Sequence, residues 1–200
     1  MKLYAFPVAP NPTKVKTYLA EKGLDIPIEI VSLPRGEQNQ PEFLARNPLG
    51  KLPVLELDDG SVLTESLAII EYLEELHPDP PLIGTSPKQR AVTRELERLC
   101  DIGVLLNVAR WIHATNSPLG LPPRPEVAAF AKKQLDQNLA VLDGRIGAGP
   151  FVAGERLSVA DCTLWAALNF ASFRELEIDP AFANVLAWRE RFSQRPSTKW

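Results

Sequence analysis

The residues with the clearest capacity for chemistry lie between positions 47 and 66. Residues 47–55 read NPLGKLPVL, so a proline stands at the entrance of an apolar run. Proline cannot donate a backbone hydrogen bond, and Pro53 therefore indicates a special local geometry, such as a cis bond in a tight turn. The free N–H and C=O of Leu52 would then face outward. They could pair with an extended peptide in the way that an added strand does.

A second chemical feature follows at Glu65 and Ser66, where a predicted strand gives way to a helix. The unpaired N–H groups and the positive end of a helix hold a carboxylate well at such a junction. An edge for a peptide backbone next to a pocket for an amino-acid head predicts a small peptide ligand. The alternative is that both residues serve only as ordinary first-turn helix residues.

Strands and helices must position these groups, and their order can be predicted from turns and periodicity. A strand over 2–6, a helix starting near Thr13 and a strand over 28–31 predict a parallel pair with a right-handed crossover. A short helix over 41–46 follows. Asp-Gly at 59–60 then predicts a hairpin. A helix capped by Thr64 closes the set. The expected fold is α/β, a four-stranded mixed sheet covered by helices.

The second half of the chain carries helical periodicity and little strand signal. Helices are expected over 88–116 and 125–146, from Ser158 onward, and over 182–194. Ser158 and Asp161 have the S-x-x-D spacing of a capping box, which favours a structural role. The predicted organisation is an α/β domain over 1–79, a linker over 80–87 and an all-helical domain over 88–200.

Composition narrows the functional classes. The chain has 200 residues, 45% hydrophobic and 24% charged, with a formal net charge of −3. No basic surplus favours nucleic acid, and no run approaches the ~20 apolar residues of a membrane span. No secretory signal is expected at the start. Cys100 and Cys162 lack metal-ligand spacing and are expected to be buried thiols in a reducing, cytoplasmic compartment, with no metal bound.

Several motifs in order resemble the cytosolic glutathione transferase family. They are Pro7-x-x-Pro10-Asn11-Pro12 before a helix, PEFL at 41–44, the 47–55 stretch, Glu65-Ser66, and FVAG at 151–154 leading to SVAD at 158–161. The resemblance covers nearly the whole chain. It implies a thioredoxin-like N-terminal domain followed by a helical-bundle domain, and a homodimer. It also implies that glutathione binds to the first domain and a hydrophobic electrophile between the domains.

The resemblance also assigns a glutathione site. Leu52, before Pro53, matches the position whose backbone pairs with the cysteinyl part of glutathione. Ser66 matches the residue that holds the γ-glutamyl carboxylate, and Glu65 the one that faces the ammonium group. Lys51 matches a position that contacts the peptide. Gln38 lies where relatives often have His and Lys that reach the glycyl carboxylate, which is a departure from the family pattern.

The resemblance assigns no Tyr, Ser or Cys activator of the thiol. The opening resembles bacterial and fungal members without the usual Tyr, Ser or Cys, and Ala9 stands where many members have a serine. Conjugation needs the thiolate, so we predict that Asn11 and the N–H groups of the helix start stabilise it. His113 is the second candidate, through a water held near the thiol. Pro10, Trp111 and His113 are the predicted walls of the hydrophobic substrate pocket.

Three readings of function follow from these residues. The first is a glutathione transferase that conjugates the thiolate to small hydrophobic electrophiles. The second is a binding or scaffold protein that kept the fold and lost the chemistry, which the alanine at position 9 would allow. The third is another glutathione-dependent enzyme, namely a peroxidase, an isomerase or a dehalogenase. The intact Glu65–Ser66 pair favours the enzymatic readings.

Overall fold

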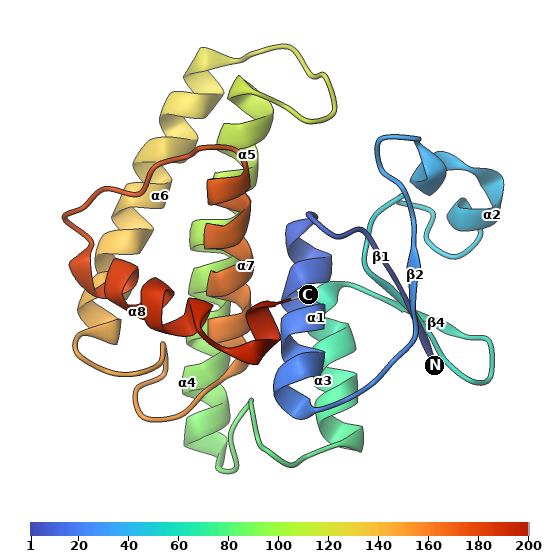
Figure 1. Cartoon of the computed structure of the whole chain (residues 1–200), viewed down its shortest axis with the longest axis horizontal. Helices are drawn as coiled ribbons and strands as arrows, with labels where there is room; N and C mark the ends of the chain where they lie inside the picture. The colour runs from blue at the N-terminus through green and yellow to red at the C-terminus, as the bar shows by residue number, and fades with distance from the viewer. Residues whose placement is uncertain (200) are drawn as a thin grey trace. The chain divides into compact units, whose positions relative to one another are not determined.

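The computed structural model describes residues 1–199 (Figure 1). The chain divides into two compact units, Met1–Pro80 and a second unit from Pro81 onward. Leu82 and Ile83, in the segment expected to be a linker, are buried. The Leu82 carbonyl accepts a hydrogen bond of 3.0 Å from the Val159 N–H. This segment is therefore packed as part of the second unit.

The first unit contains a four-stranded mixed sheet, as the sequence predicted. Strand order is β2-β1-β3-β4, with β1 and β2 parallel and the other two pairings antiparallel. Tyr4 is opposite Val54, which in turn is opposite Thr64. The strands are β1 (Lys2–Ala5), β2 (Ile28–Ile30), β3 (Val54–Glu56) and β4 (Val62–Thr64).

Helices α1 and α3 cover one face of this sheet, and α2 lies beyond the other face (Figure 1). The prediction that α1 starts near Thr13 was wrong, because the helix begins at Pro10. Prolines are tolerated in a first turn, whose N–H groups have no helical acceptor in any case. The elements are α1 (Pro10–Lys22), the 3₁₀ turn η1 (Glu37–Asn39), α2 (Pro41–Leu44) and α3 (Ser66–Leu76).

Helices α1 and α3 run parallel and are joined at both ends. Near their C-terminal ends, the Tyr18 hydroxyl donates to Glu74 Oε2 at 2.7 Å. Lys22 Nζ lies 3.1 Å from the same carboxylate and donates to the Pro80 carbonyl at 2.6 Å. Near the N-terminal ends, Asn11 contacts Ser66. The two helix starts are therefore held side by side.

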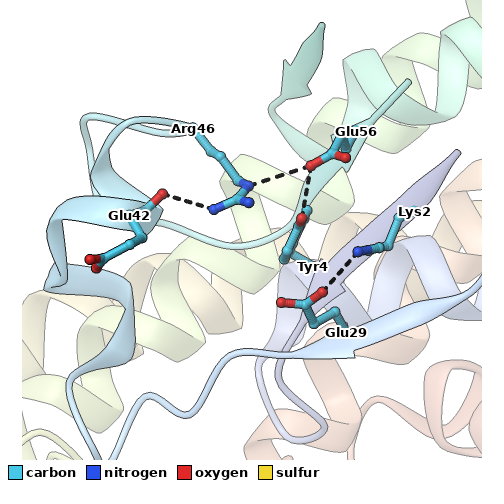
Figure 2. A network of polar contacts seen from close by, with 6 residues as sticks. All are labelled: Lys2, Tyr4, Glu29, Glu42, Arg46 and Glu56. Carbon is cyan, nitrogen blue, oxygen red and sulfur yellow. Dashed lines mark hydrogen bonds and ion pairs between the residues drawn. The ribbon is translucent and has the colours of Figure 1, made fainter. Parts of the chain in front are cut away.

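A polar network on the other side of the sheet fixes α2 to β3 (Figure 2). The Tyr4 hydroxyl donates to Glu56 Oε2 at 2.8 Å, and Arg46 Nε donates to the same oxygen at 3.4 Å. Arg46 Nη1 also donates to the Glu42 carbonyl at 2.8 Å. These contacts hold both ends of the loop from α2 to β3, and this loop carries residues 47–52.

The second unit is helical, and its core is formed by residues from all of its α-helices and from η2. Buried leucines of α6 at helical spacing, Leu135, Leu139 and Leu142, belong to the same cluster as Trp188. No helix within residues 1–199 is long and apolar enough to cross a membrane. The elements are α4 (Pro87–Arg98), η2 (Leu99–Leu105), α5 (Leu106–Thr115), α6 (Pro125–Ile146), α7 (Val159–Phe173), α8 (Ala183–Ser193) and the 3₁₀ turn η3 (Pro196–Thr198).

The expected continuous helix over 88–116 is interrupted by π-helix at η2. Asn107 Nδ2 donates to the carbonyls of Ile102 and Gly103, at 3.2 and 2.9 Å. A Cβ atom on Gly103 would lie 2.6 Å from Asn138 Oδ1, so a larger residue there would require the Asn138 side chain to move. Side chains that insert into the helical ladder in this way explain the widened turn.

Candidate functional site

The start of α3 offers a group of hydrogen-bond donors. The first intrahelical bond runs from the Ile69 N–H to the Glu65 carbonyl, at 3.0 Å. The N–H groups of residues 66–68 therefore have no acceptor within the helix. Ser66 adds a hydroxyl and is 6% exposed. Aligned N–H groups, the helix dipole and a hydroxyl together form a site for a carboxylate.

Glu65 precedes this helix in an unusual backbone conformation, with φ 68° and ψ 117°. Such a conformation costs a non-glycine residue about 1–3 kcal/mol and is concentrated at functional sites. The prediction that Thr64 caps the helix was wrong, because Thr64 ends β4 and Glu65 holds the N-cap position. The Glu65 side chain is exposed, and its carboxylate has no partner within residues 1–199. The carboxylate is therefore free to meet a cation beside the donors of α3.

Two predicted site residues from distant parts of the chain meet at these helix starts. The Ser66 hydroxyl donates to Asn11 Oδ1 at 3.2 Å. Asn11 is the second residue of α1 and is partly buried. The parallel packing of α1 and α3 makes this contact possible. The carboxylate site thus includes a side-chain amide that sequence reasoning had assigned to another task.

The entrance of β3 supplies an unpaired backbone edge. The Leu52–Pro53 bond is cis, as the sequence predicted. Within residues 1–199, no hydrogen bond uses the N–H or C=O of Leu52. The neighbouring Lys51 carbonyl is already occupied, because Asn47 Nδ2 donates to it at 2.8 Å. Asn47 therefore shapes the turn and leaves Leu52 as the residue available to a peptide ligand. The Lys51 side chain is exposed.

Gln38 lies against the same loop. A Cβ atom on Gly50, which has φ 60°, would be 3.1 Å from the Gln38 carbonyl oxygen. The Gln38 side-chain Oε1 is buried and has no hydrogen-bond partner among the described residues. The Gln38 backbone thus lies beside the Gly50 turn, and its side-chain oxygen is an unsatisfied buried acceptor that calls for a partner.

The start of α1 is poor in backbone donors. Pro10 and Pro12 have no N–H, and the Thr13 N–H is bonded to the Ala9 carbonyl at 3.0 Å. Asn11 carries the only backbone N–H among the first three residues of this helix. Ala9 gives no side-chain cap. The expected set of several N–H groups for a thiolate is therefore reduced to one.

His113 lies at the end of α5 in the second unit. Its Nδ1 is 2.9 Å from Ser117 Oγ. Burial lowers the pKa of His113 below its ordinary value, and the positive charge of Arg174 lowers it further. The imidazole is therefore neutral at pH 7 and able to accept a proton. Trp111 of the same helix is partly buried and packs against the core of the second unit, whereas Pro10 belongs to the first unit.

Comparison with known proteins identifies the family. Residues 3–81 match the family model of the glutathione S-transferase N-terminal domain, and residues 107–191 match that of the C-terminal domain. Glutathione S-transferase 2 of Saccharomyces cerevisiae is 35% identical over 100% of this chain and 88% of its own length. The chain belongs to the glutathione S-transferase family.

Solved structures agree with this glutathione S-transferase assignment. The crystal structure of Gtt2 from Saccharomyces cerevisiae matches with a TM-score of 0.92 and 33% identity, covering 100% of this chain and 99% of that one. A glutathione S-transferase domain-containing protein from Marinobacter aquaeolei has a TM-score of 0.92 and 36% identity, with both chains fully covered. The fold is thus a thioredoxin-like domain followed by a helical domain, as predicted.

Two residues of this glutathione S-transferase escaped sequence reasoning. Ser117 and Arg174 surround His113, one by contact and one by charge. The spacing of four between His113 and Ser117 at a helix end is a signal that could have found the serine. Arg174 has no such signal, because it is distant in sequence. Within residues 1–199, no group of three or more His, Cys, Asp or Glu is placed to hold a metal ion.

Proposed function

We propose that this protein is a glutathione transferase that adds the glutathione thiolate to small hydrophobic electrophiles, a detoxifying conjugation. The observation that carries the proposal is the start of α3. N–H groups and a Glu65 carboxylate that have no partner within residues 1–199 are adjacent there to the Ser66 hydroxyl. An α-amino acid head carries a carboxylate and an ammonium group. The N–H groups and the Ser66 hydroxyl can bind its carboxylate, and Glu65 can bind its ammonium group.

The rest of the peptide is assigned to the β3 entrance. The Leu52 N–H and C=O pair with the cysteinyl backbone, in the manner of an added strand. Pro53 ends the pairing, because it has no N–H. The Lys51 ammonium and the Gln38 side chain contact the ligand beyond its cysteinyl part, and Gln38 Oε1 has no hydrogen-bond partner within residues 1–199. This direction of binding leaves the sulfur near the start of α1.

Activation of the sulfur requires a lower thiol pKa. A free thiol with a pKa near ~8.5 is only a few per cent ionised at neutral pH. The positive end of α1 and the Asn11 N–H favour the thiolate. His113 is the second candidate for this activation, through a water, because its lowered pKa favours the neutral imidazole that can accept a proton. Trp111 and His113 are the residues of the second unit that we assign to the electrophile.

A homodimer in the cytoplasm completes the proposal. Cys100 and Cys162 are both buried thiols outside any disulfide, which suits a reducing compartment. Sedimentation velocity tests the oligomeric state independently of activity.

Binding and turnover should be tested together. Isothermal titration with glutathione is expected to show one site per chain, and an aryl-halide substrate should give a chromogenic product above the uncatalysed rate. Absence of binding at millimolar glutathione would reject the proposal. Binding without turnover on a panel of electrophiles would favour the scaffold reading.

An isomerase is the second candidate, because the relatives of this chain include maleylacetoacetate isomerases. The maleylacetoacetate isomerase of Pseudomonas aeruginosa is 36% identical over 82% of this chain and 78% of its own length. Reversible addition of a bound thiolate to a conjugated double bond allows rotation and then release of the thiolate unchanged. Glutathione-dependent isomerisation of maleylacetoacetate, faster than aryl-halide conjugation, would favour this candidate.

A further inference from the structure

The side chain of Asn11 has a use that the proposed function does not assign. Its Oδ1 accepts a hydrogen bond from the Ser66 hydroxyl at 3.2 Å. Its Nδ2 has no partner within residues 1–199. The amide is thus half satisfied, and its satisfied half is bound to the residue that we assign to the γ-glutamyl carboxylate.

The single proton of Ser66 creates a competition. In the free protein this proton points to Asn11, but a bound carboxylate needs the same proton. An amide carries both an acceptor and a donor, so it can serve Ser66 in either state. When the hydroxyl turns to the carboxylate, the amide can present Nδ2 to Ser66 Oγ instead. Ser66 then keeps two hydrogen bonds, one accepted and one donated.

We propose that Asn11 is a positioning residue for the γ-glutamyl head of glutathione, acting through Ser66. The Asn11 amide donates to Ser66 Oγ, and the Ser66 hydroxyl donates to the ligand carboxylate. Each bond in such a chain polarises the next and strengthens it. This inference rests on the proposed function and refines it. The Asn11 side chain serves the head of the ligand, and only the Asn11 backbone N–H serves the sulfur.

The scaffold around Asn11 holds it at this distance. Pro10 and Pro12 restrict the backbone on both sides of it. The bonds of Glu74 to Tyr18 and Lys22 hold α1 against α3 at their other ends. The amide is therefore presented to Ser66 by two packed helices, with no need for a loop to close.

The test uses S-methylglutathione, which has the γ-glutamyl head but no free thiol. Isothermal titration with the full chain should show binding about three- to tenfold weaker for Asn11→Ala, the range for one neutral hydrogen bond. Asn11→Asp keeps the acceptor seen in the free protein and loses the donor, so it should bind at least as weakly. Ser61→Ala, in the β3–β4 turn, is the matched control and should bind like the wild type.

A double-mutant cycle separates an indirect role from a direct one. Because Asn11 acts through Ser66, Asn11→Ala should have no further effect in a Ser66→Ala background. Equal losses in both backgrounds would overturn the proposal. Wild-type affinity in Asn11→Ala or Asn11→Asp would also overturn it. Thermal melting confirms folding of each variant, and Asn11→Ser, which keeps a donor, should recover part of the affinity.

A measurement on the sulfur separates the two candidate roles of the side chain. The pKa of the thiol of bound glutathione, read from the ultraviolet absorbance of the thiolate, should be the same in Asn11→Ala and Ser61→Ala. If Asn11→Ala raised the thiol pKa and left the affinity for S-methylglutathione unchanged, the Asn11 side chain would act on the sulfur, and the inference would be rejected. Failure of the wild type to bind S-methylglutathione would instead reject the proposed function.

Discussion

Helices α3 and α7 both begin with a serine and a carboxylate, and the two starts are opposite in their bonding. At α7, Asp161 is fully buried and accepts four hydrogen bonds. The donors are the Val152 N–H, the Trp188 Nε1–H, and the N–H and hydroxyl of Ser158. At α3, Glu65 is exposed and its carboxylate has no partner within residues 1–199.

The position of the acid relative to the helix explains the difference. Asp161 stands three residues into the motif, so its carboxylate reaches back to the Ser158 N–H, as in a capping box. Glu65 stands before Ser66 with φ 68° and cannot reach back in this way. A carboxylate with all its bonds inside the protein stabilises the fold. An exposed carboxylate such as that of Glu65, next to N–H groups without a helical acceptor, is available to a ligand.

The largest expected effect is on the stability of the α7 start. Asp161→Ala should lower the free energy of unfolding by about 3–5 kcal/mol, because several buried donors lose their acceptor at once. Urea denaturation at pH 7 measures it, with Glu65→Ala as the matched acid at the other helix. A loss below about 1 kcal/mol for Asp161→Ala would mean that the two starts do not differ as described.

The stability that Asp161 contributes at the α7 start should also depend on pH. Burial raises the pKa of Asp161 to about 6, although its hydrogen bonds act in the opposite direction. The folded state then binds more protons than the unfolded state between the ordinary pKa of 3.8 and about 6. The contribution of this group is thus fully present below that window and is lost as the pH rises through it.

Unfolding free energies measured from pH 4 to 7 should show this loss as the difference between wild type and Asp161→Asn. The expected size is about 2–3 kcal/mol across the window. Identical profiles for wild type and Asp161→Asn would contradict the raised pKa.

The two serines make a reciprocal test of binding against stability. Ser66→Ala should weaken glutathione binding about ten- to hundredfold, the range for a hydrogen bond to a charged group. Its free energy of unfolding should fall by less than about 1 kcal/mol. Ser158→Ala should leave the affinity unchanged and cost about 1 kcal/mol of stability. Titration calorimetry measures the affinity of both variants, and urea denaturation measures their stability. Equal losses of affinity in the two variants would contradict this prediction.

Much of the fold was predictable because its signals are local. The Asp-Gly turn indicated the β3–β4 hairpin, Pro53 indicated the cis bond, and the S-x-x-D spacing indicated the start of α7. The prolines at positions 10 and 12 made the predicted start of α1 too late. Proline is excluded only from the interior of a helix and is tolerated in its first turn. The π-helical turn was not predictable, because it depends on how Asn107 and Gly103 pack.

The site was predictable in its residues and not in its bonds. Asn11 and Ser66 are 55 positions apart, and only the parallel packing of α1 and α3 brings them together. The positive φ of Glu65 has no signature in sequence, because glutamate does not favour that conformation. His113 was visible as a residue type, yet its neutral state depends on burial and on Arg174.

The smallest expected effect concerns the backbone of Glu65. Glycine adopts φ 68° without steric cost, so Glu65→Gly should raise the free energy of unfolding by up to about 1 kcal/mol after its own entropic penalty. The same variant should bind glutathione more weakly, because the carboxylate is lost. Glu65→Gln keeps the strained backbone and should lose affinity without gaining stability.

Glu175→Gly, at φ 58° after α7, controls for the release of strain away from the site. If Glu65→Gly were less stable than Glu65→Gln, the backbone at the α3 start would not be strained. The contrast with α7 would then depend on hydrogen bonding alone.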